Sequence, residues 1–165
     1  MDTDKILRKI NRRPNYRRVI TICMIIISFL AGRLSAQSRA VINSYADKVS
    51  AFYNIPREIL PAIIQVESSY QVDAASHKGA HGLMQITDRA YQDYLKYNPS
   101  TYITNYQIVI DNWQANIAVG AWYLKNVCYR YTGDWRSAIS SFFWGVWNSK
   151  KSLVYYEKVR RAIDG

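Results

Sequence analysis

The chain has 165 residues, enough for one domain with a sizeable hydrophobic core, and it carries a net charge of +10. It contains 14 Tyr, 5 Trp and 4 Phe, and we interpret most of these rings as core residues and a minority as the lining of a groove. The sequence lacks the usual nucleic-acid-binding motifs, so the basic charge does not indicate a nucleic-acid partner.

The N-terminus has the arrangement of an export signal. Residues 1–36 carry eight Lys or Arg against two Asp, whereas residues 19–31 carry no charge. Thirteen residues are short for a bilayer span of about 20 residues, but they match the apolar region of a signal peptide. Ala36-Gln37-Ser38 offers a small-x-small cleavage site, yet Arg33 closely follows the apolar run. A cleaved signal peptide and an inner-membrane anchor formed by residues 19–34 therefore both stay open. In either case, residues 37–165 should be exported to the periplasm.

From residue 37 the pattern predicts helices joined by loops, and hence a mostly α domain with at most a small β element near the cleft. Val41, Tyr45, Val49 and Phe52 form a stripe at helical spacing. Further helices are predicted to start at residues 54–56, to run from a cap at Thr87-Asp88 through Tyr97, and to cover 113–128, 135–147 and 150–163. Pro61 should bend the first of these. Residues 69–86 are loop-like and include a short extended pair.

Two cysteines and two histidines give no framework for a disulfide or a metal centre. Cys23 lies in the N-terminal apolar run, and Cys128 lies in a predicted core helix. His77 and His81 are four residues apart, but no third ligand is near them in the sequence. We therefore predict no metal and no cofactor.

Glu67 is the first candidate for a chemical role, because it ends the apolar run of residues 59–66. A carboxylate at the end of an apolar helix is poorly solvated and holds its proton more tightly than in water. Such an acid can give its proton to a leaving oxygen near neutral pH. For an isolated Glu the ordinary alternative is a solvated helix end, and the surrounding motif decides between the two.

That motif extends from Glu67 to Gln85. It reads Glu-Ser, an aromatic residue two positions later, and then Ala-x-Ser-x-x-Gly-Ala-x-Gly-Leu-Met-Gln. It resembles the soluble-lytic-transglycosylase family of the lysozyme-like superfamily. Asn116–Leu124 is similar to the family's Asn-Ile-x-x-Gly-x-x-Tyr-Leu element, and Tyr155–Val159 is similar to its closing element. The resemblance covers roughly residues 45–160 and implies a lysozyme-like helical domain.

The resemblance also implies a substrate and a set of site residues. The substrate would be the glycan strands of peptidoglycan, cut between N-acetylmuramic acid and N-acetylglucosamine, with Glu67 as the single acid/base. Ser76 would contact the sugar near the cut, although a turn hydroxyl bonded to its own backbone is the alternative. The other residues expected to contact substrate are Met84, Gln85, Tyr123, Phe142 and Tyr155. For Tyr123 a place in the core is equally open.

One segment departs from the family pattern. The family has Ala-Tyr-Asn-Ala-Gly where this chain has Ser141–Gly145, so Phe142 lacks a hydroxyl and Phe143 lacks an amide. We therefore expect Glu67 to lack one hydrogen-bond partner while keeping its acid/base role.

Two other functions remain as alternatives at this stage. A lysozyme-like muramidase would cut the same bond with water, and a non-catalytic peptidoglycan-binding or assembly module would only hold the glycan. Wall remodelling, a secretion or conjugation apparatus and a phage wall-penetration device are all compatible settings.

Overall fold

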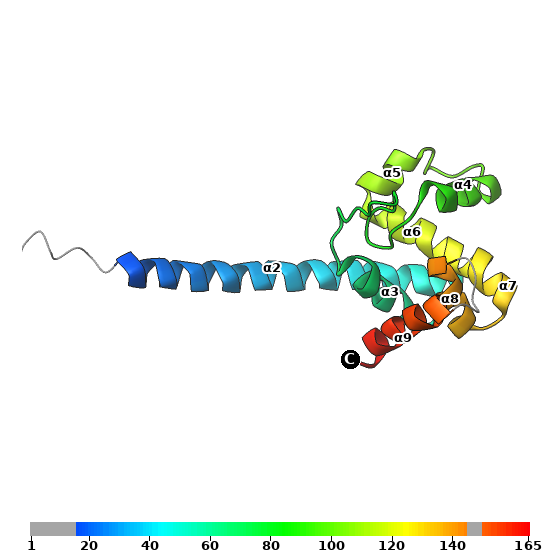
Figure 1. Ribbon diagram of the computed structural model, residues 1–165. Coiled ribbons are helices and arrows are strands. Elements are labelled where there is room, and N and C mark those ends of the chain that lie inside the picture. Colours follow the sequence, from blue (N-terminus) through cyan, green and yellow to red (C-terminus); the bar gives the residue numbers. More distant parts are fainter. Residues whose placement is uncertain (1–15, 145–149) are drawn as a thin grey trace, which may run out of the picture. The chain divides into compact units, whose positions relative to one another are not determined.

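The computed structural model describes residues 16–144 and 150–165, and this part of the chain is predominantly helical (Figure 1). The expectation of a mostly α protein is confirmed. The helices, in chain order, are α2 (Tyr16–Tyr53), α3 (Ile59–Ser68), α4 (Asp88–Tyr97), α5 (Tyr106–Asp111), α6 (Trp113–Tyr123), the π-helical η1 (Leu124–Tyr129), α7 (Arg130–Thr132), α8 (Trp135–Trp144) and α9 (Lys150–Asp164). Two isolated bridges, Ala75 with His81 and His81 with Ile86, are the β structure of the described residues.

The chain divides into two compact units, Met1–Val41 and Ile42–Gly165, and α2 contributes residues to both. The boundary lies a few residues after the one that the sequence predicts. In the first unit, the side chains described at positions 20–28 are exposed, although most of them are apolar. No helix among the described residues has both the length and the apolar character needed to cross a membrane.

The core of the second unit is built around α3 and α6. Ile63 and Ile64 of α3 have no exposed surface, and the same is true of Ile117 and Ala121 of α6. A helix that is apolar on nearly all sides is typical of a position enclosed by other helices. Burying an aliphatic side chain of this size contributes about 1.5–3 kcal/mol, so these two helices fix the frame of the domain.

The face by which α2 joins this core differs from the predicted stripe. Ile42, Ala46 and Val49 are buried, whereas Val41 is 55% exposed and Phe52 is 78% exposed. Val41 and Ile42 are adjacent apolar residues, and helical spacing fits a stripe that starts at either of them. The pattern alone could not select the buried face.

Within the second unit the helices form two groups (Figure 1). Helices α3, α8 and α9 pack together in one group, and α6 packs with α4 and α5 in the other. The π-helical turn η1 continues α6 and contacts α8, so it joins the two groups. Gly133, with φ 77°, ends this helical run where the sequence predicts a break. The last residues of the helix predicted over 135–147 lie outside the described residues.

Two helix starts differ in how well the local sequence determines them. Helix α4 begins as predicted, because the Thr87 side chain accepts a hydrogen bond from the N–H of Ala90. Helix α3 begins at Ile59, later than predicted. Pro61 then lies in the first helical turn, where backbone N–H groups have no intrahelical partner. Its missing N–H therefore costs the helix no hydrogen bond, and the bend expected at Pro61 is not needed.

Candidate active site

Glu67 lies in the last turn of α3, three residues after the buried Ile64. The helix ends beside it because Ser69 and Tyr70 both have positive φ, 51° and 67°. Glu67 is itself partly buried, and this burial raises its pKa from 4.5 to about 6. The carboxyl is therefore poorly solvated, as its place in the sequence predicts.

Helix α9 supplies two groups that oppose this rise. It packs on α3, and the Tyr155 hydroxyl donates a hydrogen bond to Glu67 Oε1 at 2.6 Å. That hydrogen bond lowers the pKa of Glu67, and the charge of Lys158 lowers it further, although burial remains the larger effect. Burial, followed by the nearby Glu67 carboxylate, raises the pKa of the Tyr155 hydroxyl well above 10. Tyr155 therefore keeps its proton and stays a donor wherever Glu67 titrates.

Two expectations concern the hydrogen bonding of Glu67. Phe142 offers no hydroxyl to Glu67, but Tyr155 does donate one hydrogen bond to it. Tyr155 was expected to contact substrate, but it is only 4% exposed and has little surface to offer. Its contact is with the acid, so Tyr155 is a positioning residue in this arrangement.

Phe142 and Tyr123 form a packing pair. Phe142 is half-buried, and its ring lies edge-on to that of Tyr123, with 6.1 Å between the centroids. Burial raises the pKa of the Tyr123 hydroxyl. Within the described part of the chain, Tyr123 makes no hydrogen bond to Glu67. For Tyr123 the structure therefore favours the core alternative.

Phe143, which lacks the amide of the family pattern, contacts the residue that donates a hydrogen bond to Glu67. Its ring stacks on the ring of Tyr155, with centroids 4.7 Å apart and planes 10° apart. The parallel rings and the Tyr155 hydroxyl thus form a series that ends at Glu67.

A buried amide holds the loop that follows α3. Asn116 of α6 has no exposed surface, and its Oδ1 accepts a hydrogen bond from the Met84 N–H at 2.8 Å. Its Nδ2 donates to the carbonyls of His81 at 2.8 Å and Val109 at 3.2 Å. Gly82 passes so close that a Cβ at this position would lie 2.4 Å from Asn116 Nδ2. No motif in the sequence assigns Asn116 a role, although a polar residue inside an apolar helix is a signal for one.

The side chains of Ser76 and Gln85 form hydrogen bonds with backbone groups of the same loop. The Ser76 Oγ accepts hydrogen bonds from two backbone N–H groups, the nearer being that of Ala80 at 3.0 Å. This is the turn hydroxyl that the sequence analysis gave as the alternative to sugar contact. Gln85 has φ 49°, and its Nε2 donates to the carbonyls of Ala74 and Gly82, each at 3.1 Å.

Met84 is a core residue in this structure and does not line a cleft as expected. It has no exposed surface, and it packs so closely on α6 that a Cβ on Gly120 would lie 2.6 Å from its Sδ. The flexible thioether fills the space that the glycine leaves.

His81 packs against an aromatic ring. The ring of His81 lies edge-on to that of Tyr106, with 6.1 Å between centroids. In residues 16–144 and 150–165, no three His, Cys, Asp or Glu side chains are grouped so that they could hold a metal ion.

Comparison with known domains identifies the family. The Transglycosylase SLT domain matches residues 44–162, which include Glu67, the loop up to Gln85, Asn116 and Tyr155. The chain belongs to the SLT transglycosylase family. The resemblance seen in the sequence is thus confirmed.

A solved structure shows the same fold as this SLT domain. It is the X-ray structure of the lytic transglycosylase Slt from Pseudomonas aeruginosa, in an inactive mutant with glutamine in place of one glutamate. The TM-score is 0.63 at 20% sequence identity, and the match covers 73% of this chain. The chain spans only 23% of the length of that protein. No curated protein matches the chain in sequence.

Proposed function

We propose that residues 42–165 form a lytic transglycosylase that cuts peptidoglycan between N-acetylmuramic acid and N-acetylglucosamine, with Glu67 as its single acid/base. The observation that carries this proposal is the partly buried Glu67 carboxyl, with a pKa of about 6 and a hydrogen bond from Tyr155. A carboxyl with this pKa is present in both protonation states near neutral pH. It can therefore give a proton in one step and take one in the next.

In the first step, protonated Glu67 gives its proton to the bridging oxygen as the bond from C1 to that oxygen breaks. The substrate's own N-acetyl group can stabilise the positive charge that develops at C1. In the second step, ionised Glu67 takes the proton of the C6 hydroxyl, and the C6 oxygen forms a bond to C1. The product carries a 1,6-anhydro ring, Glu67 regains its proton, and no water is consumed. Tyr155 stabilises the ionised carboxylate between the two steps.

The charges around Glu67 support a mechanism with one carboxylate. Ordinary glycosidases place two carboxylates about 5–9.5 Å apart on either side of the bond. Among the described residues, Lys158 is the charged side chain that shifts the pKa of Glu67, and no second carboxylate does so. Attack by the C6 hydroxyl of the substrate needs no second carboxylate to activate water, so it is compatible with these surroundings.

Product analysis tests the proposal. Purified peptidoglycan is incubated with the full-length chain, and the released muropeptides are separated and weighed by mass spectrometry. We expect ends of 1,6-anhydro-N-acetylmuramic acid, which are lighter by one water than reducing ends. Reducing ends as the main product would show a hydrolytic muramidase. Binding to peptidoglycan without any product would show a non-catalytic module. Glu67→Gln is the matched control, and it should bind the glycan but release nothing.

We further propose that this domain acts outside the cytoplasm, either released by cleavage near Ala36 or held at the inner membrane by residues 19–34. The basic residues before the uncharged run support this orientation, and peptidoglycan lies on that side. A reporter enzyme fused after Gly165 should be active outside the cytoplasmic membrane. Activity confined to the cytoplasm would refute the proposal.

A further inference from the structure

Helix α9 carries a line of side chains that begins at the acid and continues into solvent. Tyr155, Lys158 and Arg161 follow one another at intervals of three residues, and side chains with this spacing are neighbours along one ridge of a helix. Tyr155 is buried and bonded to Glu67, whereas Lys158 and Arg161 are exposed. The helical rise puts the backbones of the two cations about 4.5 Å and about 9 Å further along the axis than that of Tyr155. Lys158 and Arg161 thus form a basic ridge that leads away from Glu67.

The charge of the basic ridge is not neutralised within the helix. Both carboxylates of α9, Glu157 and Asp164, are bonded to Arg160, at 3.0 Å and 2.7 Å. In the part of the chain that the structure describes, the salt bridges involve other side chains, and Lys158 and Arg161 have no carboxylate partner. Like charges at this spacing repel each other, so the pair does not help the helix to form. An anion held by both cations would remove the repulsion.

The ordinary role of a basic residue near a helix end explains only half of this pair. Arg161 lies in the last turn of α9, where a positive charge interacts favourably with the helix dipole. Lys158 lies before that turn. Its charge instead reaches Glu67, where it lowers the pKa of the carboxyl. The near end of the basic ridge therefore lies at the acid.

We propose that the basic ridge binds carboxylates of the short peptides on the glycan strand, and so holds a peptide-bearing strand at Glu67. The inference rests on the proposed function and deepens it by naming the form of the glycan that the site prefers. The sugars themselves are uncharged where the lactyl carboxyl of N-acetylmuramic acid is used in the amide bond to the peptide, so the peptides carry the anionic groups. An ammonium and a guanidinium side by side can donate to one carboxylate or to two on the same peptide.

Anionic lipid headgroups would offer the same charge, but the position of the basic ridge favours the peptide. A lipid surface is typically contacted by a broad cluster of four to eight cations. The ridge has two, and the first of them follows the buried donor to Glu67 by one helical turn. Binding to anionic vesicles is therefore a separate arm of the test.

Binding is measured in the full-length Glu67→Gln chain, so that the result does not depend on turnover. The probes are purified peptidoglycan, followed by sedimentation, and the soluble glycan strands left when an amidase removes its peptides, followed by calorimetry. At about 0.05 M salt, adding Lys158→Gln and Arg161→Gln together should weaken binding to intact peptidoglycan about five- to tenfold, and at about 1 M salt the difference should disappear. Binding to peptide-free glycan should be unchanged. The exchange of Lys158→Arg with Arg161→Lys keeps both charges and should keep the affinity within about twofold.

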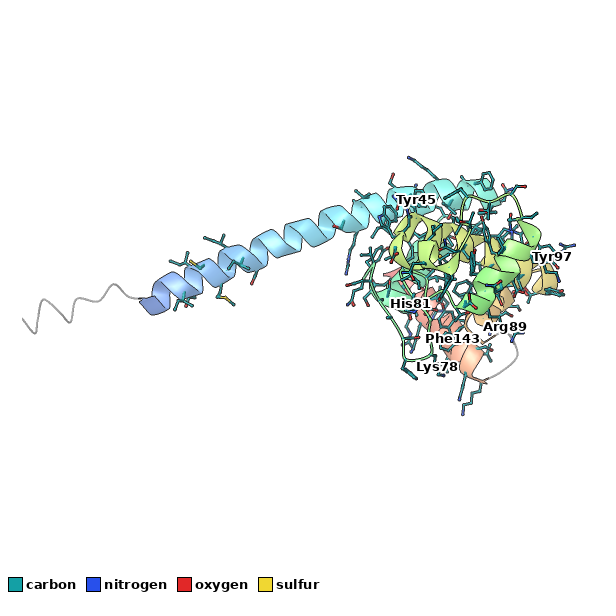
Figure 2. The ribbon with its side chains drawn as sticks, turned by 90° about the horizontal axis from the view of Figure 1, so that it is seen from above. Tyr45, Lys78, His81, Arg89, Tyr97 and Phe143 are labelled. Atoms are coloured by element: carbon teal, nitrogen blue, oxygen red, sulfur yellow. The ribbon has the colours of Figure 1, made fainter. Side chains whose placement is uncertain are left out.

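The matched control is Lys96→Gln together with Arg130→Gln. Both residues are exposed, and each lies in the last turn of its helix as Arg161 does, so the control removes the same net charge. The Lys96 ammonium lies 5.5 Å from the centre of the Tyr97 ring. Figure 2 shows Tyr97 at the edge of the second unit, and Figure 1 shows α4 apart from α9. The control pair should leave binding to intact peptidoglycan unchanged, and equal losses for the two pairs would refute a specific ridge.

The remaining outcomes separate this inference from the proposed function. If the Glu67→Gln chain binds neither form of the glycan, the proposed substrate is wrong, and the basic ridge is refuted with it. If it binds and the Lys158 and Arg161 replacements bind intact peptidoglycan equally well, only the ridge is refuted. An equal loss on peptide-free glycan would show that the cations contact the sugars. A loss confined to vesicles with about one third anionic lipid would assign them to a membrane surface. Either result overturns the inference.

Turnover gives an independent check. In the enzyme that retains Glu67, Arg161→Gln should raise KM for intact peptidoglycan without moving the alkaline limb of the pH–rate profile, because Lys158 is the cation that acts on Glu67. An unchanged KM at low salt would refute the role of Arg161 in holding the strand.

Discussion

Replacing Glu67 by glutamine should make the domain more stable at neutral pH while it abolishes cleavage. The pKa of Glu67 in the folded protein is about 6, against 4.5 in the unfolded chain. As pH rises, the unfolded chain therefore releases this proton first. Above pH 6 the charged carboxylate destabilises the fold, whereas below about pH 4.5 both states hold the proton and the penalty is absent. Glutamine has a similar shape and never carries the charge.

The size of the gain follows from the difference between the two pKa values. At about 1.4 kcal/mol per pH unit, that difference corresponds to about 2 kcal/mol at pH 7.5. The new amide N–H group must find a partner beside Tyr155, which removes part of this gain, so we expect about 1–2 kcal/mol. For a domain of this size that is a rise of about 3–8 °C in Tm.

Urea unfolding of both proteins from pH 4 to pH 8 measures the effect. At pH 4 the Glu67→Gln protein should be equally stable or up to about 1 kcal/mol less stable because of the new amide, and its stability relative to the parent should rise between pH 4.5 and pH 6.5. Asp73→Asn is the control, because Asp73 is an exposed loop carboxylate, and its replacement should change stability by less than about 0.5 kcal/mol. A Glu67→Gln protein that is equally or less stable at pH 7.5 would refute the reasoning. So would a gain that is the same at every pH.

Three further substitutions test the surroundings of the acid. Tyr155→Phe removes the hydrogen bond that lowers the pKa of Glu67, so the alkaline limb of the pH–rate profile should move up by about one pH unit; an unmoved limb would show that the bond is absent in solution. Asn116→Ala leaves one buried N–H and two carbonyls without their partner, and urea unfolding should show a loss of about 3–5 kcal/mol. A smaller loss would mean that water replaces the amide. Gly120→Ala places a Cβ 2.6 Å from Met84 Sδ, and calorimetry should show a cost of about 1–3 kcal/mol; unchanged stability would mean that the thioether moves aside.

The features that the sequence predicted well are those determined by neighbouring residues. The start of α4 depends on the Thr87 cap, and the break at Gly133 depends on a positive φ that glycine adopts easily. The poor solvation of Glu67 follows from the apolar residues that precede it in the same helix. Each of these outcomes is decided within one or two helical turns, so a local pattern contains the necessary information.

The features that the sequence did not predict depend on contacts between distant segments. Glu67 and Tyr155 are 88 positions apart, and no periodicity in either helix indicates that their side chains meet. The motif pointed to Phe142 as the position that should carry the hydroxyl, and only the packing of α9 on α3 shows that Tyr155 provides it. Asn116 is similar, because its three partners lie on the loop after α3 and on α5.

The placement of Tyr155 and Lys158 on one helix has a consequence for the chemistry at Glu67. Residues three apart lie on the same helical face, so α9 presents the hydroxyl and the positive charge to α3 together. Burial alone would make Glu67 a better acid and a poorer base, while these two groups act in the opposite direction. A single carboxyl that must first give and then take a proton needs both influences, and together they leave the pKa of Glu67 at about 6. The packing of α9 on α3 therefore sets the proton affinity of the site as well as its geometry. Because both effects depend on that contact, the C-terminal helix belongs to the chemical apparatus as much as α3 does.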